Sequence, residues 1–189
     1  AKNDIEISED EYSFANSNTM SSHGLIVGYT ETNYKKMTTN IISLSNKYRY
    51  KVSLEWKNMP STRSYDIIGI GIDSSVYIYS NIYFQQNYCY NDGSCSSSVI
   101  STPKKTNTGG AASFKLPTSS SISDLSSYLY FTVNKSSDNT LSELNAYGDY
   151  SHATSSIDSE SAKNYSINSA GIVLNSSIYN KYDEIQLAH

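Results

Sequence analysis

Hydrophobic side chains alternate with polar ones along much of this chain. The clearest alternation spans residues 48–56, where aromatic or aliphatic residues take turns with Arg, Lys, Ser and Glu. Successive side chains of a β-strand point to opposite faces of its sheet, so this pattern predicts a half-buried strand with a charged outer face. Further strands are expected at residues 24–29, 40–45, 66–72, 76–90, 98–102, 113–116, 128–134, 141–149, 171–174 and 178–185.

The order of these segments predicts the fold class. No helical periodicity extends beyond two turns, and the strands do not alternate with helices. The expected fold is therefore an all-β antiparallel β-sandwich of about nine to ten short strands, with a closed β-barrel as the alternative. Residues 1–20 are expected to form an acidic N-terminal arm with one short strand at 5–7, and residues 21–189 are expected to form a single β-sandwich domain.

The connections between the strands are predicted from their polar composition. Residues 103–110 and 151–164 are expected to be loops, and 118–127 is expected to be a serine-rich connector with one helical turn. Segment 66–72 is apolar on both faces and is expected to be a central strand. Its glycines, Gly69 and Gly71, indicate that something bulky lies close above them.

Segments 76–84 and 128–133 share an uncommon pattern, with hydrocarbon on one face and mostly tyrosine on the other. The inward positions are Val76, Ile78, Ile82, Phe84, Leu129, Phe131 and Val133. If both strands lie in one sheet, the opposite face presents an aromatic platform built from Tyr77, Tyr79, Tyr83, Tyr128 and Tyr130. Such rings suit the binding of sugars or protein surfaces. Two other interpretations stay open, because tyrosine favours strands without any partner and because other strands or the N-terminal arm can cover this face.

The two cysteines are placed to form a disulfide across a hairpin. Cys89 and Cys95 flank Tyr90-Asn91-Asp92-Gly93-Ser94, in which Asn-Asp-Gly favours a turn. Pairing of Tyr90 with Ser94 places the cysteines directly opposite each other, at the separation that a disulfide needs. A disulfide indicates an oxidising compartment, so the protein is expected to be extracellular, either secreted or on the cell surface.

Composition and charge narrow the function classes. Charged residues make up 17% of the chain, below the roughly 25% of typical soluble domains, and serine supplies about a fifth of all residues. The net charge is −4, and the 14 Lys and Arg residues form no basic stripe, which argues against nucleic-acid binding. The longest apolar run, 67–72, is much too short to be a transmembrane segment.

The opening of the chain resembles one bacterial family. The acidic stretch 9–16, the glycine-bounded strand 24–28 and the strand 48–56 resemble the start of bacterial prepeptidase-C-terminal sandwich modules. The resemblance covers about the first third of the chain and implies a secreted sandwich. The Asp-rich strand motif expected next in that family is absent from this sequence.

Catalytic and metal-binding patterns are weak. Asp149, Ser151 and His152 lie within a few residues of each other, but members of a working relay are rarely so close in sequence, and there is no Gly-x-Ser-x-Gly elbow. The segment is expected to be a polar loop with a surface histidine. No spacing singles out a carboxylate pair, a metal site or a cofactor site, so no enzyme activity, metal or cofactor is expected.

The interpretation that best fits these patterns is a non-catalytic, adhesin-like binding module outside the cytosol. Its partner is expected to be a glycan or an extracellular protein surface, recognised through the tyrosine-rich sheet face. The alternatives are a membrane-active, hemolysin-like β protein and a small secreted hydrolase with an unrecognised site. The sequence leaves the oligomeric state and the ligand's identity open.

Overall fold

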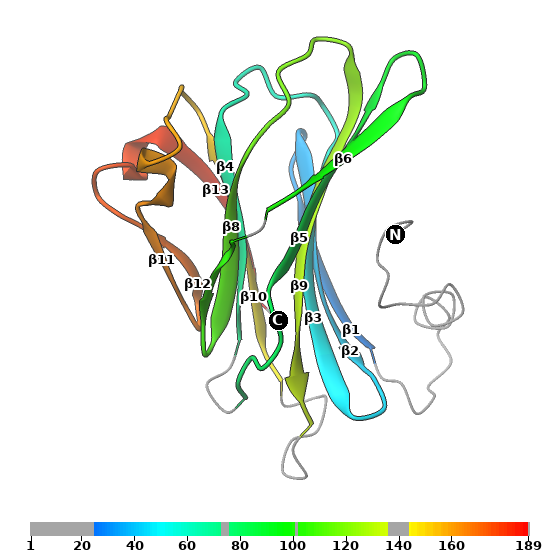
Figure 1. Ribbon diagram of the computed structural model, residues 1–189, viewed down its shortest axis with the longest axis vertical. Helices are drawn as coiled ribbons and strands as arrows, with labels where there is room; N and C mark the ends of the chain where they lie inside the picture. Colours follow the sequence, from blue (N-terminus) through cyan, green and yellow to red (C-terminus); the bar gives the residue numbers. More distant parts are fainter. Residues whose placement is uncertain (1–24, 73–75, 101, 136–143, 189) are drawn as a thin grey trace.

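The computed structural model describes residues 25–72, 76–100, 102–135 and 144–188. Two antiparallel sheets pack face to face, and a small two-stranded ribbon covers one side (Figure 1). The predicted β-sandwich is therefore confirmed, and neither of the two large sheets formed by these residues closes into a barrel. The predicted N-terminal arm, 1–20, and its strand at 5–7 lie outside the described residues.

One sheet has six strands and the other has five. In spatial order, the six-stranded sheet contains β1 (Leu25–Glu31), β2 (Lys35–Ser43), β3 (Lys47–Trp56), β9 (Ile122–Asn134), β5 (Tyr83–Tyr90) and β6 (Cys95–Val99). The five-stranded sheet contains β13 (Tyr182–Ala188), β10 (Ala146–Ala153), β4 (Tyr65–Ile72), β8 (Gly109–Lys115) and β7 (Lys104–Thr106). The ribbon consists of β11 (Tyr165–Asn168) and β12 (Gly171–Leu174), and two 3-10 turns, η2 (Ser161–Lys163) and η3 (Tyr179–Lys181), flank it in the chain.

The core lies between the facing sheets, where the alternation of β3 places its apolar side chains. Tyr50 of β3 stacks on Phe131 of β9, with ring centroids 5.6 Å apart, and both side chains are completely buried. The opposite face of β3 was expected to be a charged outer surface. This expectation is corrected at Arg49 and Lys51, which are only 0% and 9% exposed. Both cations lie against tyrosine rings of β9, as described below.

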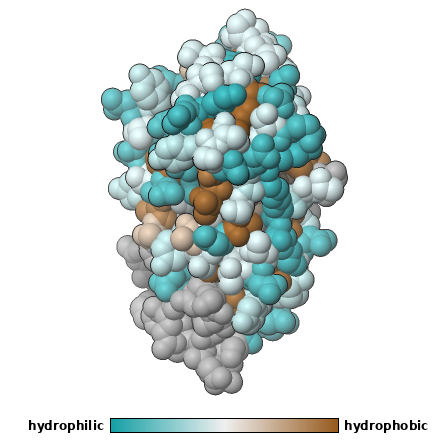
Figure 2. Space-filling model, turned by 90° about the vertical axis from the view of Figure 1, so that its left-hand side faces the viewer, coloured by the Kyte–Doolittle hydropathy of each residue, from teal (hydrophilic) through white to brown (hydrophobic). Residues whose placement is uncertain are grey.

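The glycines of β4 have the role that the sequence predicted. β4 is the central strand of its sheet, and the ribbon lies directly over Gly69 and Gly71. A Cβ on Gly69 would lie 2.8 Å from Cγ1 of Ile172, and one on Gly71 would lie 2.4 Å from the carbonyl oxygen of Ser169. The side of the molecule that carries this ribbon is mostly hydrophilic, with small separate hydrophobic areas (Figure 2).

The predicted strand 76–90 is wrong in its first half. β5 begins only at Tyr83, and before it Ile78 forms a single bridge to Val133. Because Tyr83 pairs with Tyr130, four residues, 79–82, lie opposite two residues of β9 and cannot form a regular ladder. Burial still alternates through this segment, because Val76, Ile78 and Ile82 remain in the core.

Several polar segments are strands rather than the loops that their composition indicated. Residues 103–110 contain β7 and the start of β8. Residues 122–127 of the serine-rich stretch 118–127 form the first half of β9, where Ile122 and Leu125 are buried. The predicted loop 151–164 includes the end of β10. The predicted strand 141–149 is β10 from Ala146 onwards, and positions 141–143 lie outside the described residues. Tertiary pairing satisfies these backbones, which overrides the weak strand propensity of serine and glycine.

Candidate binding surface

The five tyrosines singled out from the sequence divide into two groups. Tyr77, Tyr79 and Tyr83 are 63%, 51% and 41% exposed, whereas Tyr128 and Tyr130 are 7% and 3% exposed. The expectation of one exposed platform of five rings is therefore corrected. The register explains why Tyr83 and Tyr130 still share a face, because they are directly paired across β5 and β9.

Three of these rings form a stack that we call the tyrosine ladder: Tyr83, Tyr130 and Tyr128. Tyr83 lies nearly parallel to Tyr130 with centroids 4.9 Å apart, and Tyr130 lies 6.2 Å from Tyr128. Only Tyr83, at the end of the ladder, has substantial contact with solvent. The two buried rings therefore fix the position of the exposed ring and are not available for direct contact with a large ligand.

Cations and amides hold the buried part of the ladder. The Arg49 guanidinium lies 5.7 Å from the centre of the Tyr130 ring, and Lys51 Nζ lies 4.5 Å from the centre of the Tyr128 ring. The Tyr128 hydroxyl donates a hydrogen bond to Gln85 Oε1 at 2.8 Å. Cation–π contacts of this kind strengthen when they are shielded from water, so the outer face of β3 and β9 is a rigid support for the exposed ring.

Tyr77 and Tyr79 extend this surface from the irregular segment before β5. The two residues flank Ile78 in the chain, and the Ile78 backbone is fixed by its bridge to Val133 and by a hydrogen bond from its amide to the carbonyl of Asn107. Ser80 Oγ accepts a 2.9 Å hydrogen bond from the amide of Thr132. The exposed tyrosines therefore lie on a segment anchored at several points, and we call Tyr77, Tyr79 and Tyr83 the tyrosine surface.

Sequence reasoning missed other large exposed side chains. Tyr29 on β1, Tyr34 in the β1–β2 turn and Tyr179 in η3 are 64%, 63% and 60% exposed, and Val99 on β6 is 72% exposed. Tyr29 shares the outer face of the six-stranded sheet, and its ring lies 5.1 Å from Lys36 Nζ. Period-two alternation alone did not single them out, because only the wider packing decides which positions stay uncovered.

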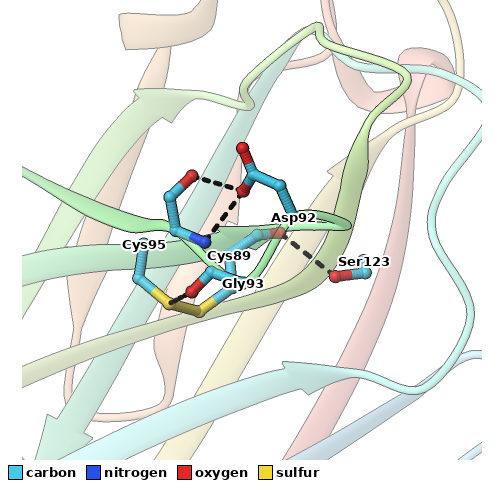
Figure 3. Close-up of a disulfide and its surroundings, with 6 residues drawn as sticks. Cys89, Asp92, Gly93, Cys95 and Ser123 are labelled. Atoms are coloured by element: carbon cyan, nitrogen blue, oxygen red, sulfur yellow. Dashed lines mark hydrogen bonds between the residues drawn. A yellow bond between two sulfur atoms is a disulfide. The ribbon is translucent and has the colours of Figure 1, made fainter.

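The predicted disulfide is confirmed at the tip of the β5–β6 hairpin (Figure 3). Cys89 pairs with Cys95, their Cα atoms are 4.0 Å apart, and the Tyr90 amide donates to the Ser94 carbonyl. Gly93 has a φ of +86°, which the turn requires and which glycine adopts without strain. A disulfide is typical of proteins that function outside the reducing cytosol.

The turn is held further by Asp92, whose Oδ1 accepts hydrogen bonds from the Ser94 amide and hydroxyl. These hydrogen bonds lower the pKa of Asp92. Asn91 donates its amide to the carbonyl of Ser121, which ties the hairpin tip to the start of β9. The hairpin is therefore fixed both by a covalent bond and by contacts outside the hairpin.

The sequence indicated that His152 is a surface residue of a polar loop, and this prediction is wrong. His152 lies on β10 with its side chain 13% exposed, and its Nδ1 lies 2.9 Å from Oδ2 of the buried Asp66 on β4. Asp66 also accepts hydrogen bonds from the Tyr150 hydroxyl and the Ala153 amide. Among the described residues no serine hydroxyl is hydrogen-bonded to His152, so the geometry is that of a buried polar network rather than an assembled Ser–His–Asp relay.

Asp149 occupies the other face of β10, beneath the ribbon, and is 1% exposed. Its Oδ2 accepts hydrogen bonds from the Ile172 amide and from Gln186 Nε2, at 3.1 and 3.2 Å. Burial, with the nearby charge of Glu184, raises the pKa of Asp149 to about 7. This carboxyl links the ribbon to the sheet, a role that the local Asp–Ser–His cluster of the sequence did not predict.

The described residues contain no cluster of three or more His, Cys, Asp or Glu side chains that could hold a metal ion. Within the same part of the chain no helix is long and apolar enough to cross a membrane.

Comparison with known proteins gives little. No family model matches the chain, which leaves the resemblance to prepeptidase-C-terminal modules unsupported, and no curated protein matches it. Among solved structures, the chain is similar to the KRT10-binding region domain of the pneumococcal serine-rich repeat protein PsrP, with 8% identity and a TM-score of 0.36. That match covers 89% of this chain and 98% of the other domain. Similarity at this level assigns no ligand to this chain.

Proposed function

We propose that this protein is a non-catalytic binding module that acts outside the cytosol and captures an extracellular protein through its tyrosine surface. The observation that carries the proposal is the exposure of Tyr77, Tyr79 and Tyr83 on one anchored segment. Tyrosine contributes a large rigid contact area at low conformational cost, and it is enriched among the residues that dominate binding energy.

The support beneath these rings favours recognition over simple solvent exposure. Tyr83 stacks on Tyr130, so binding would immobilise few additional side chains. The disulfide fits the proposed location, and the geometry around His152 supports a structural role for that residue. A glycan is the second candidate ligand, because the amide side chains of Gln85 and Asn87 lie on the same face as Tyr83.

The test is a variant in which Tyr77, Tyr79 and Tyr83 are all replaced by Ala. Purified wild-type protein is screened against immobilised extracellular-matrix and cell-surface proteins and, separately, on a glycan array. Binding to a protein that the triple variant loses by at least about tenfold supports the proposal, which corresponds to the loss of about 1.4 kcal/mol of binding free energy. Glycan binding lost in the same variant assigns the surface to the second candidate instead.

A matched control is the replacement of Tyr34 and Tyr179 by Ala, since these residues are 63% and 60% exposed but lie elsewhere. Binding should survive in the control, and both variants should keep their stability within about 1–2 kcal/mol of wild type. Equal loss of binding in the control and the triple variant contradicts the proposal. Flotation of the wild-type protein with liposomes would indicate the membrane-active alternative.

A further inference from the structure

β6 forms an open edge of the six-stranded sheet. It pairs only with β5 among the described strands, and all five of its residues, Cys95–Val99, are exposed. In Figure 1 the β5–β6 hairpin projects beyond the rest of its sheet, at the upper right. An exposed sheet edge is a template on which another extended chain can form backbone hydrogen bonds.

The register shows which backbone groups face the open side. The Tyr90 amide donates to the Ser94 carbonyl, while the Cα atoms of Cys89 and Cys95 are 4.0 Å apart, a separation typical of a non-hydrogen-bonded pair. Hydrogen-bonded and non-hydrogen-bonded pairs alternate along an antiparallel ladder. The N–H and C=O groups of Cys95, Ser97 and Val99 therefore point away from β5.

The other three edges of the two large sheets are short, charged or beside another strand, unlike β6 in the part of the chain that the structure describes. β7 has only three residues and carries Lys104 and Lys105, and β13 carries Asp183 and Glu184. β1, at the far end of the six-stranded sheet, lies beside β13. β6 has the sequence Cys-Ser-Ser-Ser-Val, which contains no charged residue and no proline, and it is longer than β7. Charges, proline and a very short strand are the features that usually block strand addition.

The edge is also fixed in shape before any partner arrives. The disulfide holds β6 against β5, and the contact between Asn91 and Ser121 holds the hairpin tip against the start of β9. Preorganisation of this kind lowers the entropic cost of binding. The outer face of β6 ends at Val99, which is 72% exposed and pairs with Gln85, two positions from Tyr83.

We propose that β6 binds an extended, uncharged peptide segment of the partner protein as a seventh strand, an inference that rests on the proposed function. Backbone groups of Cys95, Ser97 and Val99 hold the segment, and Val99 selects an apolar side chain opposite it. A segment that continues past Val99 runs toward Tyr83, so the open edge and the tyrosine surface form one site.

The chemistry of β6 favours a peptide over a second copy of this chain. Pairing two copies of β6 would bring together mainly serine side chains, with Val99 as the single aliphatic residue on each strand. A stable dimer needs about 800 Å² of buried surface per partner, which two five-residue serine-rich strands do not supply. A peptide that pairs with β6 and then contacts the tyrosine surface avoids this limit.

The probe is a displayed library of short random peptides, selected on the wild-type protein. Ser97→Pro removes an outward N–H and blocks the edge, but it takes no hydrogen bond from the ladder with β5. Ser97→Ala keeps the N–H and is the matched control. Enriched peptides should bind wild type and Ser97→Ala equally and should lose at least about tenfold in affinity for Ser97→Pro.

A second measurement keeps the test decisive if Ser97→Pro fails to fold. Backbone N-methylation of an enriched peptide at the alternate positions whose N–H groups face β6 should abolish its binding to the wild-type protein, since edge pairing depends on those N–H groups. Failure to enrich any peptide, or equal binding to Ser97→Pro together with tolerance of N-methylation, overturns the inference. A wild-type dimer that Ser97→Pro abolishes in sedimentation would assign the edge to self-association and would also overturn it.

The two proposals fail differently. If peptides bind Ser97→Pro normally but lose affinity for the triple tyrosine variant, the tyrosine surface stands and the edge does not. If peptides lose affinity for Ser97→Pro alone, the edge stands and the tyrosine surface fails.

Discussion

His152 Nδ1 lies 2.9 Å from Oδ2 of Asp66, although the two residues are 86 positions apart in the chain. β4 and β10 are adjacent antiparallel strands, and their pairing brings the two side chains together at one end of the sandwich. Asp66 is fully buried and also accepts hydrogen bonds from Tyr150 and Ala153. A buried carboxyl group that contacts two hydrogen-bond donors and the His152 ring organises this end of the core.

Replacing Asp66 by Ala should therefore destabilise the protein severely. The change leaves the Tyr150 hydroxyl and the Ala153 amide without an acceptor in a buried site, so the free energy of unfolding should fall by about 3–5 kcal/mol. Urea unfolding followed by tryptophan fluorescence measures this, since Trp56 lies against the His152 ring with centroids 4.8 Å apart. The exposed Asp124 on β9 provides the control. A loss no larger for Asp66→Ala than for Asp124→Ala would show that the network does not stabilise the fold.

Asp149 should make stability fall as the pH rises. Its pKa in the folded protein is about 7, against an ordinary value of 3.8, so between these values the folded state holds a proton that the unfolded chain has released. The contribution is fully present below pH 4, decreases up to about pH 7 and is absent above it. The full change is on the order of 4 kcal/mol.

The measurement compares the stability of wild type and Asp149→Asn at pH 4.5 and pH 8. The variant cannot ionise at this position, so its advantage over wild type should grow with pH. Glu184 on β13 supplies the nearby negative charge, and Gln186 on β13 and the Ile172 amide of β12 are the neutral groups that contact the carboxyl. Glu184→Gln should therefore give a smaller change in the same direction. Parallel pH profiles for wild type and Asp149→Asn would rule out this role for Asp149.

Gly71→Ala should displace the ribbon from the five-stranded sheet. A Cβ at this position would lie 2.4–2.6 Å from backbone atoms of Ser169, Asn168 and Gly171, and none of these can move without the ribbon turn. Overpacking of this kind costs roughly 1–3 kcal/mol, and thermal unfolding measures it. Amide hydrogen exchange should also quicken in β11 and β12.

Gly93→Ala is the comparison, because no atom lies within 4 Å of the added Cβ and only the positive φ is unfavourable. That variant should lose about 1–2 kcal/mol without any change of exchange in the ribbon. Unchanged ribbon exchange in Gly71→Ala would contradict the close packing described here.

Local patterns predicted some features correctly for identifiable reasons. The Cys89–Cys95 disulfide followed from turn residues that lie within a few positions of both cysteines. The close packing of another segment over Gly69 and Gly71 was predicted because these two positions of an otherwise apolar strand carry no side chain. Segments such as 118–127 were misjudged because serine-rich backbone becomes a strand only when a neighbouring strand, here β3 or β5, supplies its hydrogen bonds.

The all-β class, the direction in which most strand side chains point and the disulfide can all be read from the amino-acid sequence, because each depends on period-two geometry or on residues close together in the chain. The packing of the two sheets sets three other features: Tyr128 and Tyr130 are buried while Tyr83 is exposed, Asp66 contacts His152, and β6 is an edge strand among the described strands. A side chain's direction follows from its own backbone, whereas its burial and its partners depend on distant segments that pack against it.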